Sequence, residues 1–375
     1  MDFSFNDEQH MLLDSTRRFI AERYGFEHRN QVRASVDGWS RDIWRQFGEL
    51  GLLAINIPEE DGGIGAGPVG TMLVSNAIGE GLLLEPFLSS AVLATHAIVQ
   101  LGSAQQRGDW LPALASGEWI AVLAHDEAST RLDSMHIEAQ AMRSGGGWQI
   151  SGRKSMVYHA PAANLLLVSA RVGTAIGLFA IPADAAGVML SPRTTVDEQR
   201  AADIVFDKVM VDANARLGHA GSDQDVREGL QLVLDQGLAA LCAEAFGAMD
   251  KILSATIEYS RSRVQFGVPI GSFQALQHRM AEMLMHLEQA RSMSYLAVLR
   301  CTDSDSVARR AALSAAKVLM GQAARYIGQQ AVQLHGGMGM TDELDVSHYF
   351  KRLLAFELRC GTTDDHLAVY RRQMR

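Results

Sequence analysis

The sequence contains little proline, little cysteine and no excess of basic residues. Only 8 of its 375 residues are proline, against 34 glycines, so few segments are forbidden to be helical. The formal net charge of -9 argues against a protein that binds duplex DNA, which would be basic. The 47% of hydrophobic residues excludes a disordered or collagen-like chain. At roughly 100–200 residues per domain, the length predicts two to four domains.

The three cysteines, Cys242, Cys301 and Cys360, are far apart and odd in number. No CxxC pair or Cys/His ligand spacing occurs, so we expect neither a disulfide framework nor a metal site. A reducing cytoplasm is the expected compartment. The chain starts with the polar, acidic stretch MDFSFNDEQH, which lacks the features of a secretory signal. The longest apolar stretch, residues 164–190, is broken by arginine, glycine, proline and aspartate, so we expect no membrane span.

The pattern of the sequence changes twice along the chain. From residue 6 to about residue 119, apolar residues recur at three- and four-residue steps, which predicts helices, with starts at Ser15 and Asp37. Short β-branched or alternating runs then predict the strands of a small antiparallel barrel or sandwich. A period of 3.6 residues returns from residue 228 onward and ends near two glycines at 336–337. The predicted domains are residues 1–118, helical, residues 119–226, β, and residues 227–375, helical.

Several common motifs are absent or stand in the wrong context. Residues 65–70 (GAGPVG) fit the spacing of a dinucleotide fingerprint, but a polar, turn-rich segment precedes them and Pro68 stands where an amide should face phosphate. No GxSxG elbow or Walker loop occurs, which excludes the corresponding hydrolase and NTPase templates. Four histidines in the C-terminal third show no ligand spacing and are expected to be ordinary buried or surface residues: His278, His335, His348 and His366.

Two segments combine residues suited to a planar ligand that carries phosphate. Residues 261–274 place two arginines, aromatic residues, a glycine and a side-chain amide between two amphipathic helices. Arginine suits phosphate because its planar guanidinium forms paired, charge-assisted hydrogen bonds. Residues 333–339 (QLHGGMG) place three glycines just past a helix, which permits close approach of a ligand to the backbone. A solvated loop and simple helix termination are the alternative interpretations of these two segments.

Together with others, these segments resemble the acyl-CoA dehydrogenase family over the whole chain. Residues 49–63 are similar to the family's ELG…PEEYGG motif, residues 263–274 to RxxFG…Q, and residues 333–337 to QxxGG. Residues 37–40 (DGWS) and 241–250 (LCAEAFGAMD) are similar to the small subunit of pimeloyl-CoA dehydrogenase and other two-subunit enzymes. The resemblance implies an α+β fold with an N-terminal α-helical domain, a middle antiparallel β-barrel and a C-terminal four-helix bundle.

The resemblance also implies the chemistry of a flavoprotein oxidoreductase of fatty acid metabolism. FAD, bound without a covalent bond, accepts a hydride from the β-carbon of an acyl-CoA thioester while a base removes the α-proton. Hydrogen bonds must polarise the thioester oxygen, because an α-C–H is a weak acid. Electrons then pass to an electron-transfer flavoprotein. The implied assembly is a tetramer, a dimer of dimers, formed by one kind of chain or with a larger paralogous subunit. No nucleic-acid partner is implied.

The resemblance places contacts to FAD in two parts of the chain. In the middle, residues 124–127 (AHDE) and 156–158 (MVY) stand for the family's VTEP and WIT motifs, and residues 129–133 (STRLD) stand for GAGSD. Only Glu127 of the first motif is retained, and the tryptophan of WIT is replaced. Near the end, Thr362 matches the threonine of the terminal EGT motif. The implied cofactor-binding residues are His125, Asp126, Met156, Val157, Tyr158, Arg263, Phe266, Phe273, Gln274, Gln333, Gly336, Gly337, Thr362 and Asp364.

The catalytic base is the main departure from the family. Many members carry Glu directly before the terminal Gly-Thr, where this chain has Cys360, and an unperturbed thiol with a pKa of ~8.5 is a poor substitute. Other members carry Glu on the first helix of the bundle, at a register that falls on Gly237. The remaining candidate bases are Glu244, two helical turns beyond Gly237, and the carboxylates around Cys360, which are Glu357, Asp364 and Asp365.

Two interpretations of function follow from this departure. In the first, the chain is the subunit of an acyl-CoA dehydrogenase that lacks the usual base and works with a catalytic partner. In the second, the chain alone is a dehydrogenase with a non-standard base. A flavin oxidase or monooxygenase on the same fold is a further alternative. The sequence leaves open the identity of the base, the acyl chain, the electron acceptor and the choice between homo- and hetero-oligomer.

Overall fold

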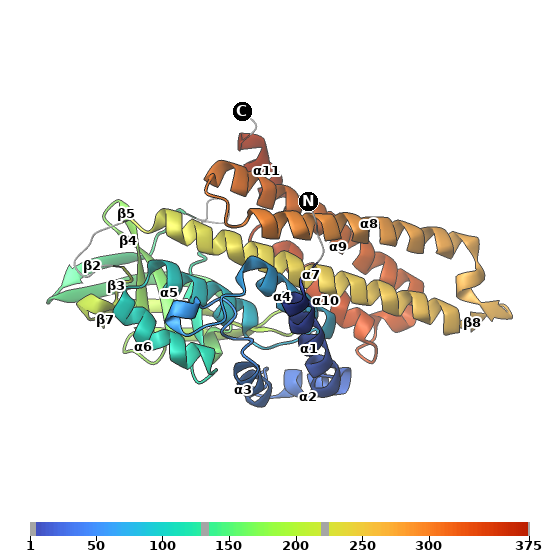
Figure 1. Ribbon diagram of the computed structural model, residues 1–375, viewed down its shortest axis with the longest axis horizontal. Helices are drawn as coiled ribbons and strands as arrows, with labels where there is room; N and C mark the ends of the chain where they lie inside the picture. The colour runs from blue at the N-terminus through green and yellow to red at the C-terminus, as the bar shows by residue number, and fades with distance from the viewer. Residues whose placement is uncertain (1–4, 129–134, 219–224, 374–375) are drawn as a thin grey trace. The chain divides into compact units, whose positions relative to one another are not determined.

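The structure is a computed structural model that describes residues 5–128, 135–218 and 225–373 (Figure 1). The chain divides into two compact units. The helical unit comprises Met1–Asn30, Pro68–Leu83 and Leu238–Arg375, and the sheet unit comprises Gln31–Gly67 and Leu84–Gly237. Each unit is considered by itself below. The predicted boundaries of three domains stay a prediction.

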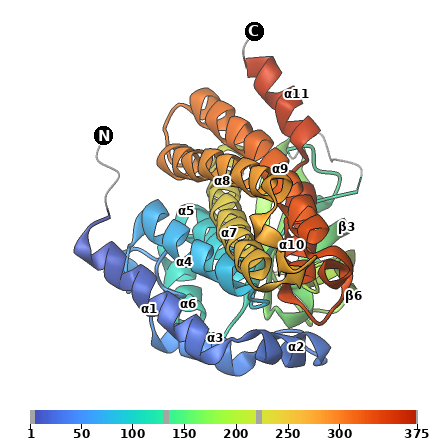
Figure 2. The ribbon, with the colours of Figure 1, turned by 90° about the vertical axis from the view of Figure 1, so that its right-hand side faces the viewer.

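The helical unit is built from long helices, with α8 and α10 packed beside α9 (Figures 1 and 2). A short two-stranded hairpin separates α7 from α8. Two helices cross the boundary between the units, namely α2 (Phe26–Ala34) and α7 (Arg227–Ser262). The other elements of this unit are α1 (Asp7–Arg23), α4 (Gly67–Gly81), β8 (Val264–Gln265), β9 (Val268–Pro269), η5 (Ile270–Ser272), α8 (Gln274–Arg300), α9 (Ser306–His335), η6 (Gly336–Met340), α10 (Asp345–Leu358) and α11 (Thr363–Gln373).

The sheet unit contains one seven-stranded sheet in the order β1-β4-β2-β3-β7-β6, with β5 paired to β4. Most pairs are antiparallel, as predicted, but β4 runs parallel to both β1 and β2. The strands are β1 (Ala121–Ala124), β2 (Gln140–Ser144), β3 (Gly147–Tyr158), β4 (Leu165–Val172), β5 (Ala175–Pro182), β6 (Val188–Thr194) and β7 (Arg200–Val211). The helical elements are α3 (Arg41–Glu49), η1 (Glu59–Asp61), η2 (Phe87–Ala94), α5 (Thr95–Leu101), α6 (Ala104–Ala115), η3 (Ala160–Ala162) and η4 (Ala213–Ala215). A helical N-terminal region, a middle sheet and C-terminal helices confirm the predicted α+β fold.

The two predicted helix starts in the N-terminal region are wrong. Asn6 caps α1 in a capping box with Gln9, and Ser15 lies in the middle of that helix. Ser40, rather than Asp37, caps α3 by accepting a hydrogen bond from a backbone amide.

The long helix α7 is the single described helix with the length and apolar composition of a membrane span. Its apolar window has a mean hydropathy of 1.4, and 83% of that window is buried inside the protein. A mostly buried apolar helix is typical of the core of a globular domain, so this match is weak evidence for a membrane span.

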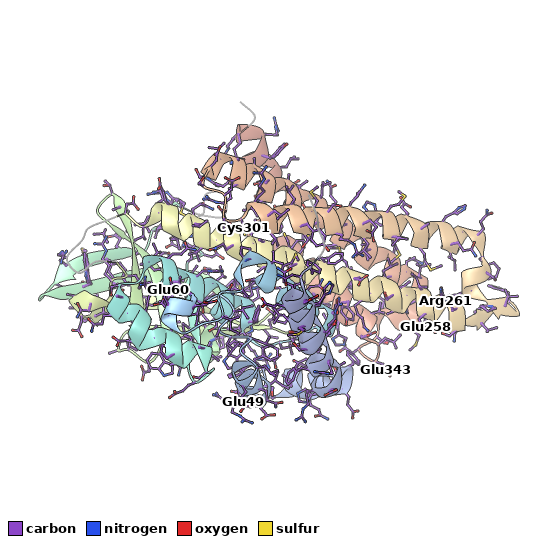
Figure 3. All side chains as sticks on the ribbon, in the orientation of Figure 1. Glu49, Glu60, Glu258, Arg261, Cys301 and Glu343 are labelled. Atoms are coloured by element: carbon purple, nitrogen blue, oxygen red, sulfur yellow. The ribbon has the colours of Figure 1, made fainter. Side chains whose placement is uncertain are left out.

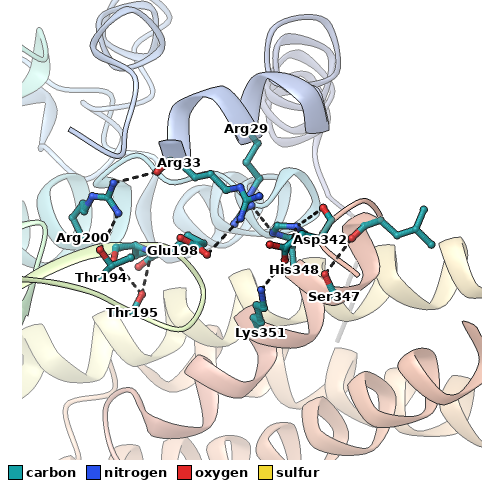
Figure 4. Close-up of polar contacts among 12 residues, drawn as sticks. Arg29, Arg33, Thr194, Thr195, Glu198, Arg200, Asp342, Ser347, His348 and Lys351 are labelled. Carbon is teal, nitrogen blue, oxygen red and sulfur yellow. Dashed lines mark hydrogen bonds and ion pairs between the residues drawn. The ribbon is translucent and has the colours of Figure 1, made fainter. Parts of the chain in front are cut away.

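The C-terminal end of α4 is capped by side chains from other helices of the helical unit. Tyr349 donates to the carbonyl of Glu80 in the last turn of α4, while Arg29 and Arg352 donate to the carbonyls of Leu82 and Leu83 just past its end, each at 2.9 Å. Cations are favourable there because the helix dipole is negative at its C-terminus. Arg29 also donates to Nδ1 of His348 at 3.0 Å, so Nε2 of this buried histidine carries the proton (Figure 4). His348 is thus an ordinary buried histidine, as the sequence predicts.

Candidate functional site

A β-bulge shapes the backbone at residues 155–158, the stretch that stands for the family's WIT motif. The register of β3 against β7 shifts between Lys154 and Val157. Met156 adopts a positive φ of 50° in this bulge, and its amide donates to the Asp203 carboxylate at 3.0 Å. Met156 is 42% exposed, Val157 is buried and Tyr158 is half-buried. Bulges commonly re-aim side chains next to ligand sites, and this one turns Met156 towards solvent.

The bulge lies directly beside the segment that follows β1. The amide of Ser155 donates to the carbonyl of Asp126 at 2.8 Å, so the structure brings together residues 125–126 and 155–158. Asp126 is exposed, whereas His125 is buried with Nδ1 at 3.0 Å from the hydroxyl of Ser169. The five middle-domain residues predicted to bind cofactor therefore form one contiguous region. Residues 129–133, the stretch that stands for GAGSD, lie outside the described residues.

A buried ion pair lies beneath this region. The ammonium of Lys154 donates to the Glu127 carboxylate at 2.7 Å, to the His125 carbonyl at 3.0 Å and to the Ser169 hydroxyl at 2.9 Å. Burial lowers the pKa of Lys154 to about 8, although the Glu127 charge acts in the opposite direction. Glu127 also accepts hydrogen bonds from two backbone amides at 2.7 and 3.1 Å. Glu127 thus ties β3 to the segment that precedes β2.

In the helical unit, the hairpin formed by β8 and β9 presents aromatic rings to solvent. Phe266 is 92% exposed with a φ of 55°, and it packs edge-on against Phe273 with ring centroids 6.1 Å apart. Arg261 lies 3.9 Å from Glu258 on the last turn of α7 (Figure 3). Arg263 is exposed, and its guanidinium has no ion-pair partner within residues 5–128, 135–218 and 225–373. The hairpin therefore combines a free cation with open aromatic faces.

The other predicted residues of this unit lie at helix ends. Gln274 is the exposed first residue of α8, and Gln333 is exposed on the last turn of α9. Gly336 ends α9 with a φ of 62°, which an L side chain rarely adopts. A Cβ added at Gly336 or Gly337 would meet no atom within 4 Å, so the backbone is open on that side. Asp364 is exposed on the first turn of α11.

The residues of the helical unit fit FAD at its phosphate and adenine end. The exposed guanidinium of Arg263 suits a pyrophosphate, the rings of Phe266 and Phe273 suit a planar base, and the open backbone at Gly336 permits close approach. Thr362 fits less well as a donor to phosphate. Its amide and its hydroxyl both donate to the Asp365 carboxylate, at 2.9 and 2.7 Å. In this conformation Thr362 offers a ligand only an acceptor.

Thr362 belongs to the segment 360–363, called the 360–363 loop here, which joins α10 to α11 and includes the first residue of α11. Lys317 donates to the carbonyl of Gly361 at 2.7 Å, and His366 lies 2.7 Å from the carbonyl of Cys360 through Nε2. Glu357 accepts from the amide and the hydroxyl of Thr363, both at 2.9 Å. Side chains from α9, α10 and α11 therefore hold every residue of this loop.

The candidate base Glu244 forms a buried ion pair. Its carboxylate lies 2.7 Å from the guanidinium of Arg352 on α10, and the two side chains are 7% and 4% exposed. The Arg352 guanidinium also bonds the end of α4, so Glu244 balances a cation that the fold buries. This pairing favours a structural role for Glu244. Two further candidates, Glu357 and Asp365, are likewise bonded to the 360–363 loop.

The two positions where the family carries its base have different surroundings. Cys360 is exposed, with a φ of 55°. Gly237 is buried on α7, and a Cβ added there would clash with the side chain of Leu93. Neither position carries a carboxylate.

Sequence reasoning missed the buried cations that organise both units. Lys154, Lys317 and Arg352 are almost completely buried, although lysine and arginine are usually exposed. Their partners lie 27, 44 and 108 residues away along the chain. One sequence feature could have predicted the burial of Lys317, which stands among apolar residues that recur with a 3.6-residue period.

The comparisons with known families agree with this fold and cover nearly the whole chain. The profile for the acyl-CoA dehydrogenase N-terminal domain matches residues 6–118, that for the middle domain matches residues 122–209, and that for the C-terminal domain matches residues 230–374.

Curated proteins of known activity are similar to the chain over its full length. An L-prolyl-(peptidyl-carrier protein) dehydrogenase from Pseudomonas fluorescens is 29% identical, with 100% of each chain covered. The mitochondrial isovaleryl-CoA dehydrogenase of Oryza sativa is 28% identical, with 99% of this chain and 92% of the relative covered.

Solved structures share the fold. A variant of the Tcur3481-Tcur3483 steroid ACAD aligns with a TM-score of 0.89 and 27% identity, over 98% of each chain. The ChsE4-ChsE5 complex from Mycobacterium tuberculosis aligns with a TM-score of 0.90 over 100% of this chain and 99% of that chain. At 24% identity, the second similarity shows the fold alone.

Proposed function

The chain belongs to the acyl-CoA dehydrogenase family, and from this premise we propose that it is the subunit of a two-component acyl-CoA dehydrogenase that lacks its own base. As a member of the family it is a flavoprotein oxidoreductase that uses FAD. In the proposed complex, a paralogous partner subunit provides the Glu that removes the α-proton of the thioester. The assembled enzyme then desaturates the α,β-bond of an acyl-CoA.

The observation that carries this proposal is the absence of a free carboxylate at the positions of the base. Cys360 and Gly237 occupy the two positions, and Leu93 fills the space beside Gly237. Two of the candidate substitutes, Glu244 and Glu357, accept hydrogen bonds from Arg352 and Thr363. In this conformation these oxygens bond groups of the fold, and a substrate would have to displace those groups to reach them.

The parts of the site that remain suit cofactor binding. Arg263 would bind phosphate, Phe266 and Phe273 would flank the adenine, and the backbone at Gly336 and Gly337 would approach the cofactor closely. When bound, FAD supplies the hydride acceptor. These side chains would orient it, and the bulge at Met156 would present backbone groups to the flavin ring. The remaining implied residues are Gln274, Gln333, Asp364, Val157, Tyr158, His125 and Asp126.

A similar protein supports the need for a partner. The structure that aligns at 27% identity carries a name that joins two designations, Tcur3481 and Tcur3483. We infer that this chain likewise assembles with a second, related subunit, as a dimer of dimers. Electron transfer to an electron-transfer flavoprotein and a cytoplasmic location also stay predictions, as does the closeness to the small subunit of pimeloyl-CoA dehydrogenase.

The test is anaerobic titration of the purified, FAD-loaded chain with a panel of thioesters. The panel should hold straight-chain, dicarboxylyl, aromatic and steroid-derived acyl-CoAs, and an acyl carrier-protein thioester. We expect no loss of the visible flavin absorbance with the lone chain, and full bleaching after co-expression with a Glu-bearing paralogue.

The matched control is a complex in which the Glu of the paralogue is replaced by Gln. This complex should bind the thioester without bleaching, because the proton acceptor is lost while the shape is kept. Bleaching by the lone chain would contradict the proposal and favour the self-sufficient dehydrogenase. Reduction followed by rapid reoxidation in air would favour the oxidase alternative.

A further inference from the structure

We propose that Lys317 and His366 are positioning residues that fix the conformation of the 360–363 loop, which carries residue 360 and the implied FAD contact Thr362. This inference rests on the proposed function, because the direction of the loop matters to the chemistry only where FAD is bound.

The 360–363 loop has a backbone that the chain would not adopt by itself. Cys360 and Gly361 are consecutive residues with positive φ, at 55° and 94°. A non-glycine residue in this region is strained, and it persists only where the surroundings over-determine it. The loop therefore needs contacts that hold it in place.

Lys317 provides the first of these contacts from α9. Its side chain is fully buried, and its ammonium lies 2.7 Å from the Gly361 carbonyl and 3.3 Å from the Glu357 carbonyl. The ammonium also lies 4.5 Å from the centroid of the Phe356 ring. Burial lowers the pKa of Lys317, which reflects the loss of hydration of its charge. The acceptors are carbonyls at the end of α10, where the helix dipole favours a cation.

His366 provides the second contact from α11. Its Nε2 lies 2.7 Å from the Cys360 carbonyl, and a carbonyl only accepts, so Nε2 carries a proton. Its Nδ1 lies 3.3 Å from the hydroxyl of Ser314, which is able to donate. Burial lowers the pKa of His366, so the ring is neutral at pH 7 with the proton on Nε2. The consecutive carbonyls of Cys360 and Gly361 are thus bonded by side chains from two different helices, α11 and α9.

The two contacts determine where the side chain of residue 360 points. With both peptide groups fixed, Cys360 keeps only rotation about χ1, and its side chain is exposed while the neighbouring Arg359 is buried. The position that carries the base in many family members is thereby turned outwards by a rigid loop. Thr362 is fixed in the same way, with its donors directed to Asp365.

Stability alone gives little reason for a buried ammonium at position 317. Burying an ammonium costs hydration free energy that its hydrogen bonds and charge contacts repay only where their geometry is good. A role in positioning and a role in packing therefore predict different results for Lys317→Met. Packing predicts an effect on the free energy of unfolding, whereas positioning predicts an effect on the loop and on FAD.

The experiment compares Lys317→Met and His366→Leu, which remove the two contacts, with His366→Gln, whose amide N–H lies near the position of Nε2. The control is Lys351→Met on α10, since Lys351 pairs with Asp342 and does not touch the loop. Two quantities are measured on the full chain, which are hydrogen exchange of the amides at residues 360–363 and the dissociation constant of FAD by fluorescence titration.

Lys317→Met and His366→Leu should each speed exchange in the loop and weaken FAD binding by about tenfold, the scale of one charge-assisted or buried hydrogen bond. His366→Gln should stay within about twofold of the wild type, because it restores the donor. Wild-type exchange and wild-type FAD affinity in Lys317→Met and His366→Leu would overturn the proposal. Faster exchange with unchanged FAD affinity would also overturn it, because the role would then be structural only.

Two further outcomes remain decisive. If Lys317→Met does not fold, the pair His366→Leu and His366→Gln carries the same comparison. If the wild-type chain binds no FAD, the FAD-binding part of the proposed function is contradicted. The exchange data alone then test whether Lys317 and His366 fix the loop.

Discussion

Positions 237 and 360 are both predicted to stand where acyl-CoA dehydrogenases carry a base, but their surroundings in this chain differ. Gly237 is buried in α7, and the side chain of Leu93 occupies the space beside it. Cys360 is exposed on a loop that Lys317 and His366 hold by its carbonyls. At position 237 the side chain of Leu93 occupies space that a new side chain would need. Position 360 has space for a side chain and lacks only the carboxylate. A single substitution should therefore restore a base at one position and not at the other.

The largest effect is expected from Cys360→Glu in the FAD-loaded lone chain. A positioned general base contributes about 10²–10⁴-fold, so acyl-CoA should bleach the flavin faster than in the wild type by a factor in this range. Stopped-flow absorbance under anaerobic conditions measures the rate. Cys360→Gln is the control, with similar size and no basic group. Equal rates for the Glu and Gln variants would show that residue 360 does not face the substrate.

The second effect concerns Glu244, which lies on α7 two turns beyond Gly237. Glu244→Gln removes the negative charge that lies 2.7 Å from the buried Arg352 guanidinium, which should lower the free energy of unfolding by about 3–5 kcal/mol. Urea denaturation measures this change. Glu288→Gln on α8 is the control, because its ion pair with Arg291 is exposed and should contribute less than about 1 kcal/mol.

The same Glu244→Gln change also tests whether Glu244 itself is the base. In the complex with a partner, the rate of flavin bleaching by acyl-CoA should stay as in the wild type. A selective loss of bleaching, with the stability unchanged, would reverse the assignment and make Glu244 the base.

A smaller effect is expected at position 237. Gly237→Glu should destabilise the chain by about 1–3 kcal/mol, because the new side chain clashes with Leu93. Part of this cost should disappear in a Leu93→Ala background, and a double-mutant cycle by urea denaturation measures the coupling. A stable Gly237→Glu variant without such coupling would show that the position is open, and the contrast with position 360 would fail.

The smallest expected effect is a pH dependence of the free energy of unfolding, and it arises from His366, which contacts the carbonyl of Cys360. Burial lowers the pKa of His366 below its ordinary value of 6.5, so the unfolded chain binds a proton more readily than the folded chain. Stability from this group is complete above pH 6.5 and is lost as the pH falls towards the folded pKa. Relative to His366→Gln, the wild type should lose up to about 1 kcal/mol between pH 7 and pH 5.5. Parallel stability curves for the two proteins would contradict this.

The order of helices and strands was predictable because it depends on local periodicity. The apolar repeat of α7 and the short alternating runs of β3 and β7 report directly which face of each element is buried. The helix start was misassigned at Ser15 because its hydroxyl bonds back to the carbonyl of Leu12 at 3.0 Å, inside the helix. A serine in a capping position and a serine in mid-helix look alike in a sequence.

The candidate site was predictable only as a set of residues, not as a set of contacts. The resemblance located Arg263, Phe266 and Thr362, but the pairing of Thr362 with Asp365 depends on how α11 begins. The partners of Lys317 lie 40 and 44 residues away, and tertiary packing alone determines such contacts. No local pattern distinguishes a buried lysine that holds a loop from a solvated one.

The pair formed by Lys154 and Glu127 has a consequence for how the sequences of this family change. Replacing Glu127 or Lys154 alone removes one charge of a buried ion pair, at about 3–5 kcal/mol each. We therefore expect the two residues to change together. The presence of Glu127, in a stretch where the rest of the VTEP motif has been replaced, fits a role in holding the sheet that is separate from any contact with the flavin.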